Sequence, residues 1–150
     1  MAGFAAAVGA WADKIPGAME AIFRESASRL ARELTLELER LVYERPQSPD
    51  AKARTGFLRA SLVASKASMP TLSRANPGVA ADLDQGAIEL AIQGAEIGET
   101  IFLGYTANYG AYIHYGSGGR PARPWVTMVA QRWPQIVADV TRDLKRRLGL

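Results

Sequence analysis

IFLGYTANYGAYIHYGSGGRPARPW, residues 101–125, joins a strand pattern to a Tyr-rich turn and then to a Gly/Pro/Arg loop that leads into a helix. Tyr109, Tyr112 and Tyr115, three of the five Tyr in the chain, surround the only His. Tyr and Arg side chains provide contact area and directional hydrogen bonds at a low entropic cost. The stretch is therefore typical of a surface that binds another macromolecule, and it suits catalysis poorly.

The segments before this stretch predict a small antiparallel sheet. Apolar residues alternate with polar or small ones over residues 87–93, which predicts a strand. Residues 100–106 predict its partner, and the Gly-containing turn between the two strands indicates a hairpin. A further strand is expected at residues 62–66, followed by a long loop over residues 69–84 that is rich in Pro, Asn, Ser and Gly.

Helical spacing dominates the N-terminal part of the chain. Apolar residues recur every three or four positions over residues 4–43. Because Pro favours the first turn of a helix, Pro16 predicts a short helix that ends near Lys14 and a long helix that starts at Pro16. The two Pro within residues 45–50 end that long helix.

Shorter helices and a kinked C-terminal helix complete the expected layout. Thr55 is a candidate N-cap for a single helical turn, and residues 108–115 read as two more turns. The last helix is expected to start near Pro124 and to kink or split at Pro134. The sequence thus predicts one α+β domain over residues 1–150, with residues 1–15 as an N-terminal extension.

Composition supports a single globular domain. The chain has 150 residues, of which 48% are hydrophobic and 22% charged, and it has no Cys. The absence of Cys excludes disulfides, thiolate nucleophiles and Cys-ligated zinc. No apolar run is long enough to span a bilayer. The Ala-rich start carries Asp13 and Lys14 where an export signal would remain apolar, so we interpret it as part of the mature protein.

The net charge of +3 is unevenly distributed along the chain. Residues 1–50 carry six Lys/Arg against eight Asp/Glu, residues 51–119 carry five against five, and residues 120–150 carry seven against two. The positive surplus therefore lies at the C-terminus. It would face nucleic acid, an acidic protein surface or only water.

No catalytic, metal or cofactor site is predicted. His114 would have to meet Ser61 or Ser65 and Asp82 or Asp84 in space to form a catalytic triad, and no nucleophile-elbow sequence supports this. One His with scattered carboxylates falls short of a metal site. The Gly-rich segment before Arg120 lacks the Lys-Ser/Thr ending of a phosphate-binding loop. We therefore interpret His114 as a partly buried residue whose tip is hydrogen-bonded.

Three short motifs occur in a specific order: TGFLRAS at residues 55–61, NYGAYIHYG at 108–116 and RPARPW at 120–125. With the long helix before them and the helix after them, they make residues 16–148 resemble the tail-component family of tailed bacteriophages. That family comprises tail completion, neck and head-tail joining proteins similar to the minor tail protein Z of lambda-like siphophages. The chain departs from the common pattern at Gly110, where Ala is usual, and at Trp125, where Phe is usual.

The resemblance implies a non-enzymatic structural protein of the virion, assembled in the bacterial host cytoplasm. It implies a homo-oligomeric ring, expected to be hexameric, at the top of the tail. The expected neighbours are the tail terminator or tail tube protein and the head connector or stopper protein, with DNA passing through the lumen and no membrane involved. The level within the neck, the ring size and the kind of particle (virus, prophage remnant or gene-transfer particle) stay open.

Two sets of residues follow from this interpretation. The expected subunit or neck interface comprises Tyr109, Tyr112, His114, Tyr115, Arg120, Arg123, Pro124 and Trp125. The residues expected to face DNA are Arg54, Arg59, Arg142, Lys145, Arg146 and Arg147. Two alternatives remain: a small basic nucleic-acid-binding protein that uses its C-terminal helix, and an esterase-like enzyme that uses Ser61 and His114.

Overall fold

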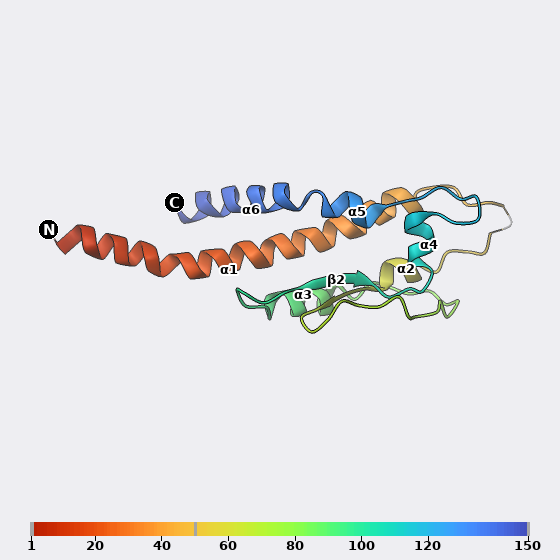
Figure 1. Ribbon diagram of the computed structural model, residues 1–150, viewed down its shortest axis with the longest axis horizontal. Coiled ribbons are helices and arrows are strands. Elements are labelled where there is room, and N and C mark those ends of the chain that lie inside the picture. Colours follow the sequence, from red (N-terminus) through yellow and green to blue (C-terminus); the bar gives the residue numbers. More distant parts are fainter. Residues whose placement is uncertain (1, 50, 150) are drawn as a thin grey trace.

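A long N-terminal helix runs along most of the elongated molecule in the computed structural model, which describes residues 2–49 and 51–149 (Figure 1). This helix, α1 (Ala2–Leu38), continues into a π-helical turn, η1 (Glu39–Tyr43). The predicted break before Pro16 is wrong, because α1 passes through Pro16 without interruption. Proline removes one backbone hydrogen bond from a helix interior but does not always end the helix. The predicted end before the two Pro of residues 45–50 is confirmed, because η1 ends at Tyr43.

A two-stranded antiparallel sheet packs on one side of α1. Strand β1 (Leu62–Ser65) pairs with β2 (Phe102–Tyr105), and Leu62 lies opposite Tyr105. Both strands were expected from the sequence, but the predicted hairpin is wrong. Its first strand is instead a helix, α3 (Gln85–Gln93), which begins where the Asp84 carboxylate accepts a hydrogen bond from the Ala87 amide.

The alternation over residues 87–93 fails as a strand signal for a simple reason. Ile88 and Ile92 are four positions apart and are buried together, which fits a helix as well as a strand. Leu90 lies between them on the opposite side of α3 and is 77% exposed. The aspartate N-cap then favours the helix.

The loop that joins β1 to α3 has the length expected from the sequence. It contains neither a helix nor a named strand, and it is fixed beside β2 through the main chain of Arg74. The Arg74 amide donates to the Thr106 carbonyl, and the Arg74 carbonyl accepts from the Asn108 amide, both at 2.8 Å. The loop also reaches the first motif, because the Ala81 amide donates to the Thr55 carbonyl at 2.9 Å.

The remaining helices are short except the last. They are α2 (Phe57–Ala60), α4 (Gly110–Tyr115), α5 (Trp125–Ala130) and α6 (Trp133–Leu148). The predicted split of the C-terminal helix at Pro134 is confirmed, since α5 ends before it and Pro134 lies in the first turn of α6. The α+β class and the single domain are likewise confirmed.

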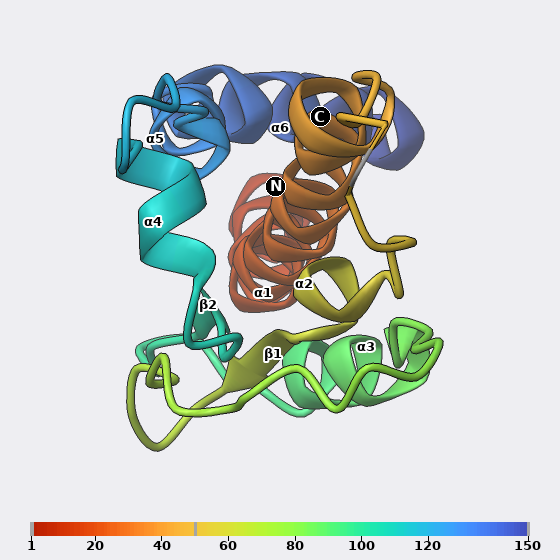
Figure 2. The same cartoon turned by 90° about the vertical axis from the view of Figure 1, so that its right-hand side faces the viewer.

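The core forms around the second half of α1. Figure 2 shows α1 between α5 and α6 on one side and β1, β2 and α3 on the other, with α4 connecting the two sides. Leu38, Leu58, Ile92, Trp125 and Val129 are among the most deeply buried side chains. Within the described residues, no helix is long and apolar enough to cross a membrane.

Candidate functional site

The three sequence motifs lie around one surface pocket of about 530 Å³, which we call the motif pocket. The pocket is lined by residues of α2, α4 and the loop before α5, which lie at the end of the molecule away from the N-terminus (Figure 1). Its principal lining residues are Tyr43, Arg54, Thr55, Phe57, Asn76, Tyr109, Tyr112, Ser117, Arg120 and Arg123. Segments more than 40 residues apart in sequence thus form one surface.

The first motif makes a tight turn into α2. Gly56 has a φ of +77°, and a Cβ there would lie 3.0 Å from the Ala81 carbonyl oxygen, so only glycine fits. Thr55 was expected as the N-cap, but Gly56 takes that position. The Thr55 hydroxyl instead accepts from the Phe57 amide at 3.2 Å and supports the turn.

The third motif is held against the second. Gly116 has a φ of +81°, and a Cβ there would lie 2.7 Å from the Arg120 carbonyl oxygen. A turn follows in which the Arg120 amide donates to the Ser117 carbonyl at 3.0 Å. The Gly-rich segment therefore forms a defined turn, and it carries Arg120 and Arg123 to the rim of the pocket.

Arginine and tyrosine side chains organise the base of the pocket. A guanidinium nitrogen of Arg54 donates to the Tyr43 carbonyl at 2.6 Å. The Arg59 guanidinium lies 5.1 Å from the centre of the Tyr43 ring and pairs with Glu39 at 2.8 Å. Arg59 was expected to face DNA, but it is only partly exposed and already has a carboxylate partner.

The motif pocket has an excess of positive charge. Its described lining residues include Lys52, Arg54, Arg120 and Arg123 but no Asp or Glu. Burial lowers the pKa of Arg123, and the positive charges of Arg45, Arg54 and Arg120 lower it further. An Arg cluster of this kind is suited to bind a carboxylate or phosphate supplied by another molecule.

Two of the expected interface tyrosines are well exposed. Tyr112 is 65% exposed and Tyr115 is 77% exposed. Tyr109 is half-buried beside Phe57, and burial raises the pKa of its hydroxyl. Pro124 is partly buried and directly precedes α5. Exposed Tyr beside Arg is the composition found at energetically important parts of protein interfaces.

His114 and Trp125 lie inside the subunit instead of on its surface. They are 7% and 1% exposed, with ring centres 5.3 Å apart. The His114 Nε2 atom is 3.4 Å from the amide nitrogen of Thr127, which donates to it, and burial lowers the His114 pKa. We expected these two residues at the interface, but this expectation is wrong because both side chains are buried. They pack inside the subunit, His114 from α4 and Trp125 from α5.

The possible serine–histidine pair is not assembled. The Ser61 hydroxyl is fully buried and donates to the Leu58 carbonyl at 2.7 Å. The His114 ring interacts with Thr127, and no hydrogen bond joins it to Ser61 among the described residues. No group of three or more metal-ligating side chains forms within the same residues.

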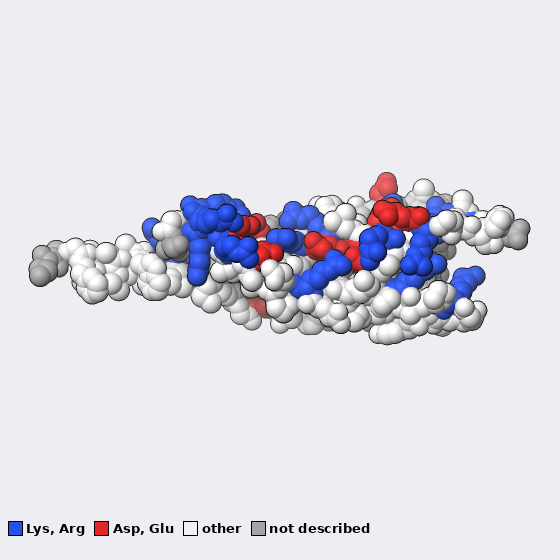
Figure 3. All heavy atoms as spheres, turned by 90° about the horizontal axis from the view of Figure 1, so that it is seen from above, with Lys and Arg blue, Asp and Glu red and all other residues white. Residues whose placement is uncertain are grey.

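The six residues expected to face DNA form two separate groups. Arg54 lines the motif pocket and Arg59 lies against the ring of Tyr43, which also lines it, whereas Arg142, Lys145, Arg146 and Arg147 lie in the C-terminal half of α6 (Figure 3). Three of the α6 cations already have acidic partners: Arg142 pairs with Asp139, Arg146 with Asp143 and Arg147 with Glu25.

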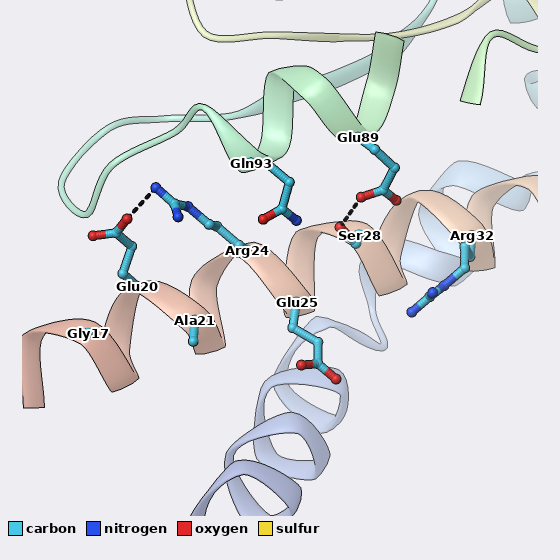
Figure 4. A pocket seen from close by; sticks show the side chains of 9 residues that line it. All are labelled: Gly17, Glu20, Ala21, Arg24, Glu25, Ser28, Arg32, Glu89 and Gln93. Atoms are coloured by element: carbon cyan, nitrogen blue, oxygen red, sulfur yellow. Dashed lines mark hydrogen bonds and ion pairs between the residues drawn. The ribbon is translucent and has the colours of Figure 1, made fainter. Parts of the chain in front are cut away.

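A second hollow, of about 630 Å³, lies between α1 and α3 (Figure 4). Its polar side chains largely satisfy one another. The Ser28 hydroxyl donates to Glu89 at 2.8 Å, and Arg24 pairs with Glu20 while donating to the Ala95 carbonyl. We therefore interpret this hollow as part of the packing interface between α1 and α3.

Sequence patterns did not reveal every residue of the motif pocket. Tyr43 and Asn76 both line it, yet neither belongs to a motif. Tyr43 is the last residue of the apolar pattern over residues 4–43 and lies at the end of η1. The Asn-Pro-Gly sequence at residues 76–78 is the local signal of the turn that brings Asn76 to the pocket.

Comparison of the chain with protein-family models, with curated proteins and with solved structures finds no match. The order of the three motifs and their convergence on one pocket are therefore the observations that bear on function.

Proposed function

We propose that this chain is a structural protein of the neck or tail top of a phage or phage-like particle. In this role it forms a ring, hexameric by expectation, that completes the tail and joins it to the head connector, and DNA passes through the lumen. The observation that carries the proposal is the meeting of the three motifs at the motif pocket, which combines exposed Tyr with an excess of Arg.

A ring built from identical subunits needs two different contact surfaces on each subunit. The motif pocket is one candidate. A second lies at the opposite end of the molecule, where the start of α1 projects beyond the other elements and exposes Phe4 and Trp11 (Figure 1). An elongated subunit with distinct contact surfaces at its two ends is suited to this kind of assembly.

The charge of the motif pocket fits contact with an acidic partner. Carboxylates of a neighbouring subunit or neck protein would pair with Arg120 and Arg123, which have no acidic partner among the described residues. Arginine forms bidentate, directional pairs with carboxylates. The same side chains also suit the phosphates of DNA in the lumen, a contact that would weaken steeply with salt.

The test is complementation of a particle that lacks this protein. Arg123→Ala combined with Tyr112→Ala removes one cation and one exposed ring from the motif pocket and should leave the fold intact, because neither side chain is buried in the core. We expect electron micrographs to show separate heads and tails. Arg32→Ala, an exposed change on α1 away from the motif pocket, serves as control and should join them normally.

Normal joining in the Arg123/Tyr112 double variant would count against the motif pocket as the joint. If the purified protein instead binds DNA as a monomer, with strong salt dependence and no ring at any concentration, the nucleic-acid-binding alternative replaces the neck role.

A further inference from the structure

The first part of α1 is exposed to solvent over residues 3–14. We call residues 3–15 the N-terminal arm. Its large apolar side chains are Phe4, Val8, Trp11 and Ile15, spaced four, three and four positions apart, so they form one stripe along the helix. Phe4 is 80% exposed and Trp11 53% exposed. Figure 1 shows the N-terminal arm extending past the C-terminal end of α6.

The N-terminal arm is slender and nearly uncharged. Residues 2–12 contain no Asp, Glu, Lys or Arg, and Ala and Gly occupy most positions between the large side chains. A Cβ built on Gly3 or Gly9 would meet nothing within 4 Å. No contact within the subunit therefore requires glycine at position 9. A second chain that packs closely against the N-terminal arm would require it.

An apolar groove of about 330 Å³ opens between β2, α4 and the start of α5. Leu34 of α1 lines one wall, and the edges carry Met69, Leu72, Tyr115 and Val126, all of which are exposed. The described residues that line it include no Asp, Glu, Lys or Arg. The groove thus matches the N-terminal arm in its lack of charge and offers apolar surface to the Phe4–Trp11 stripe.

An arm cannot fill the groove of its own subunit. Trp11 and Leu34 lie on the same unbroken helix, 23 positions apart, which corresponds to about 35 Å along the axis. A continuous helix does not fold back on itself, so an N-terminal arm in the groove has to come from a different molecule.

We propose that the N-terminal arm of one copy docks in the apolar groove of a second copy of this chain. Because arm and groove are different surfaces, the contact is head-to-tail, and each subunit both donates an arm and receives one. Because Phe4 is 80% and Trp11 53% exposed, burying both would remove about 200–330 Å² of their surface from water. That such contacts close into a ring rests on the proposed function.

The absence of Cys makes this contact testable by thiol cross-linking in the full chain. Val8→Cys marks the N-terminal arm, and Val126→Cys marks the groove edge. When the two variants are mixed and treated with a short bismaleimide, a dimer cross-linked between Val8→Cys and Val126→Cys should form at least tenfold above background. Val8→Cys mixed with Leu90→Cys, an exposed position on α3, is the control and should stay at background.

A second variant tests whether the apolar stripe drives association. Phe4→Ser combined with Trp11→Ser should convert the wild-type oligomer to monomer in native mass spectrometry with an unchanged circular dichroism spectrum, whereas Leu90→Ser should leave the oligomer intact. Cross-links formed mainly between two Val8→Cys chains would overturn the proposal in favour of arm-to-arm pairing.

The remaining outcomes separate the docking proposal from the proposed function. A wild-type ring that persists without the arm-to-groove cross-link overturns the docking and leaves the neck role standing. Cross-linked chains that never close into a ring support the docking and count against the ring. A wild-type protein that stays monomeric at every concentration overturns both.

Discussion

The main-chain amide of Arg123 donates to the carbonyl of Ile113 at 3.1 Å, which holds the third motif directly against α4. This bond fixes the position of the Arg-bearing loop relative to Tyr109 and Tyr112 in the second motif. The turn that allows it depends on Gly116, whose backbone has a positive φ.

Gly116→Ala should therefore destabilise the protein. A Cβ at this position would lie 2.7 Å from one backbone atom and 2.9 Å from another, and the left-handed conformation adds strain. We expect a loss of about 2–4 kcal/mol in the free energy of unfolding, measured by urea denaturation. Gly118→Ala is the matched control: its φ is also positive but its surroundings are open, so only about 1 kcal/mol should be lost.

Ile88→Ala and Leu90→Ala distinguish the helix α3 from the strand that alternation predicts. In a strand with one buried face, both side chains would be buried together. In α3, Ile88 is 2% exposed and Leu90 is 77% exposed. Ile88→Ala should cost about 2–5 kcal/mol in unfolding free energy, and Leu90→Ala should change it by less than about 0.5 kcal/mol. Equal losses would contradict the helix.

The same segment shows how far the sequence determines the fold. Local patterns predicted β1, β2, α4 and the split at Pro134, because each depends on residues close in the chain. The pairing of β1 with β2 was missed because it joins segments about 40 residues apart, and short alternating runs do not distinguish a strand from a two-turn helix.

The candidate site was predictable to a similar extent. Its motifs were visible in sequence, but their meeting point depends on tertiary contacts such as the bond between Ala81 and Thr55. Burial could not be predicted from the sequence either, because no local sequence pattern distinguishes the buried His114 and Trp125 from the exposed Tyr112. Aromatic residues of the second and third motifs were therefore assigned to the surface together, although only some of them are exposed.

Arg132→Ala should destabilise the contact between α1 and the start of α6. Arg132 pairs with Glu33 at 2.9 Å and with Glu37 at 2.8 Å, and Glu37 is buried. Because Arg132 is itself partly exposed, we expect a loss of about 1–3 kcal/mol by urea denaturation at pH 7. Arg142→Ala, which breaks an exposed pair with Asp139, should cost less than about 0.5 kcal/mol.

The Arg132 effect should depend on pH. A hydrogen bond from Arg40 lowers the pKa of Glu37, burial opposes this, and Arg132 lowers the pKa further, so the net shift is downward. A carboxylate with a lowered pKa stabilises the fold above its unfolded pKa, about 4.3, and loses this contribution as the pH falls through the folded value. The difference between wild type and Arg132→Ala should therefore shrink in acid, and a difference unchanged at pH 3 would contradict the assignment.

His114 should make the protein less stable in mild acid. Burial lowers its pKa from the ordinary 6.5, so the unfolded chain binds a proton more readily than the folded one. Stability is then greatest above about pH 6.5 and decreases as the pH falls below it. His114 is the only His, and His114→Gln should remove this slope in thermal unfolding measured between about pH 5 and 7. A wild type with no slope in that range would show that His114 titrates normally.

Gly9→Ala separates the stability of the subunit from the docking of its N-terminal arm. Glycine inside a helix costs about 1 kcal/mol relative to alanine, and a Cβ at Gly9 meets nothing within the subunit. Gly9→Ala should therefore raise the helical content of the monomer. If the backbone of a second copy approaches Gly9 closely, the same change should weaken association about tenfold in sedimentation velocity, although the monomer is more helical. Gly17→Ala is the matched control, because Gly17 lies in the same helix with equally open surroundings but outside the N-terminal arm. Gly17→Ala should increase the helical content and leave association unchanged. If Gly9→Ala and Gly17→Ala have the same effect on association, the second copy approaches the N-terminal arm closely at a position other than Gly9.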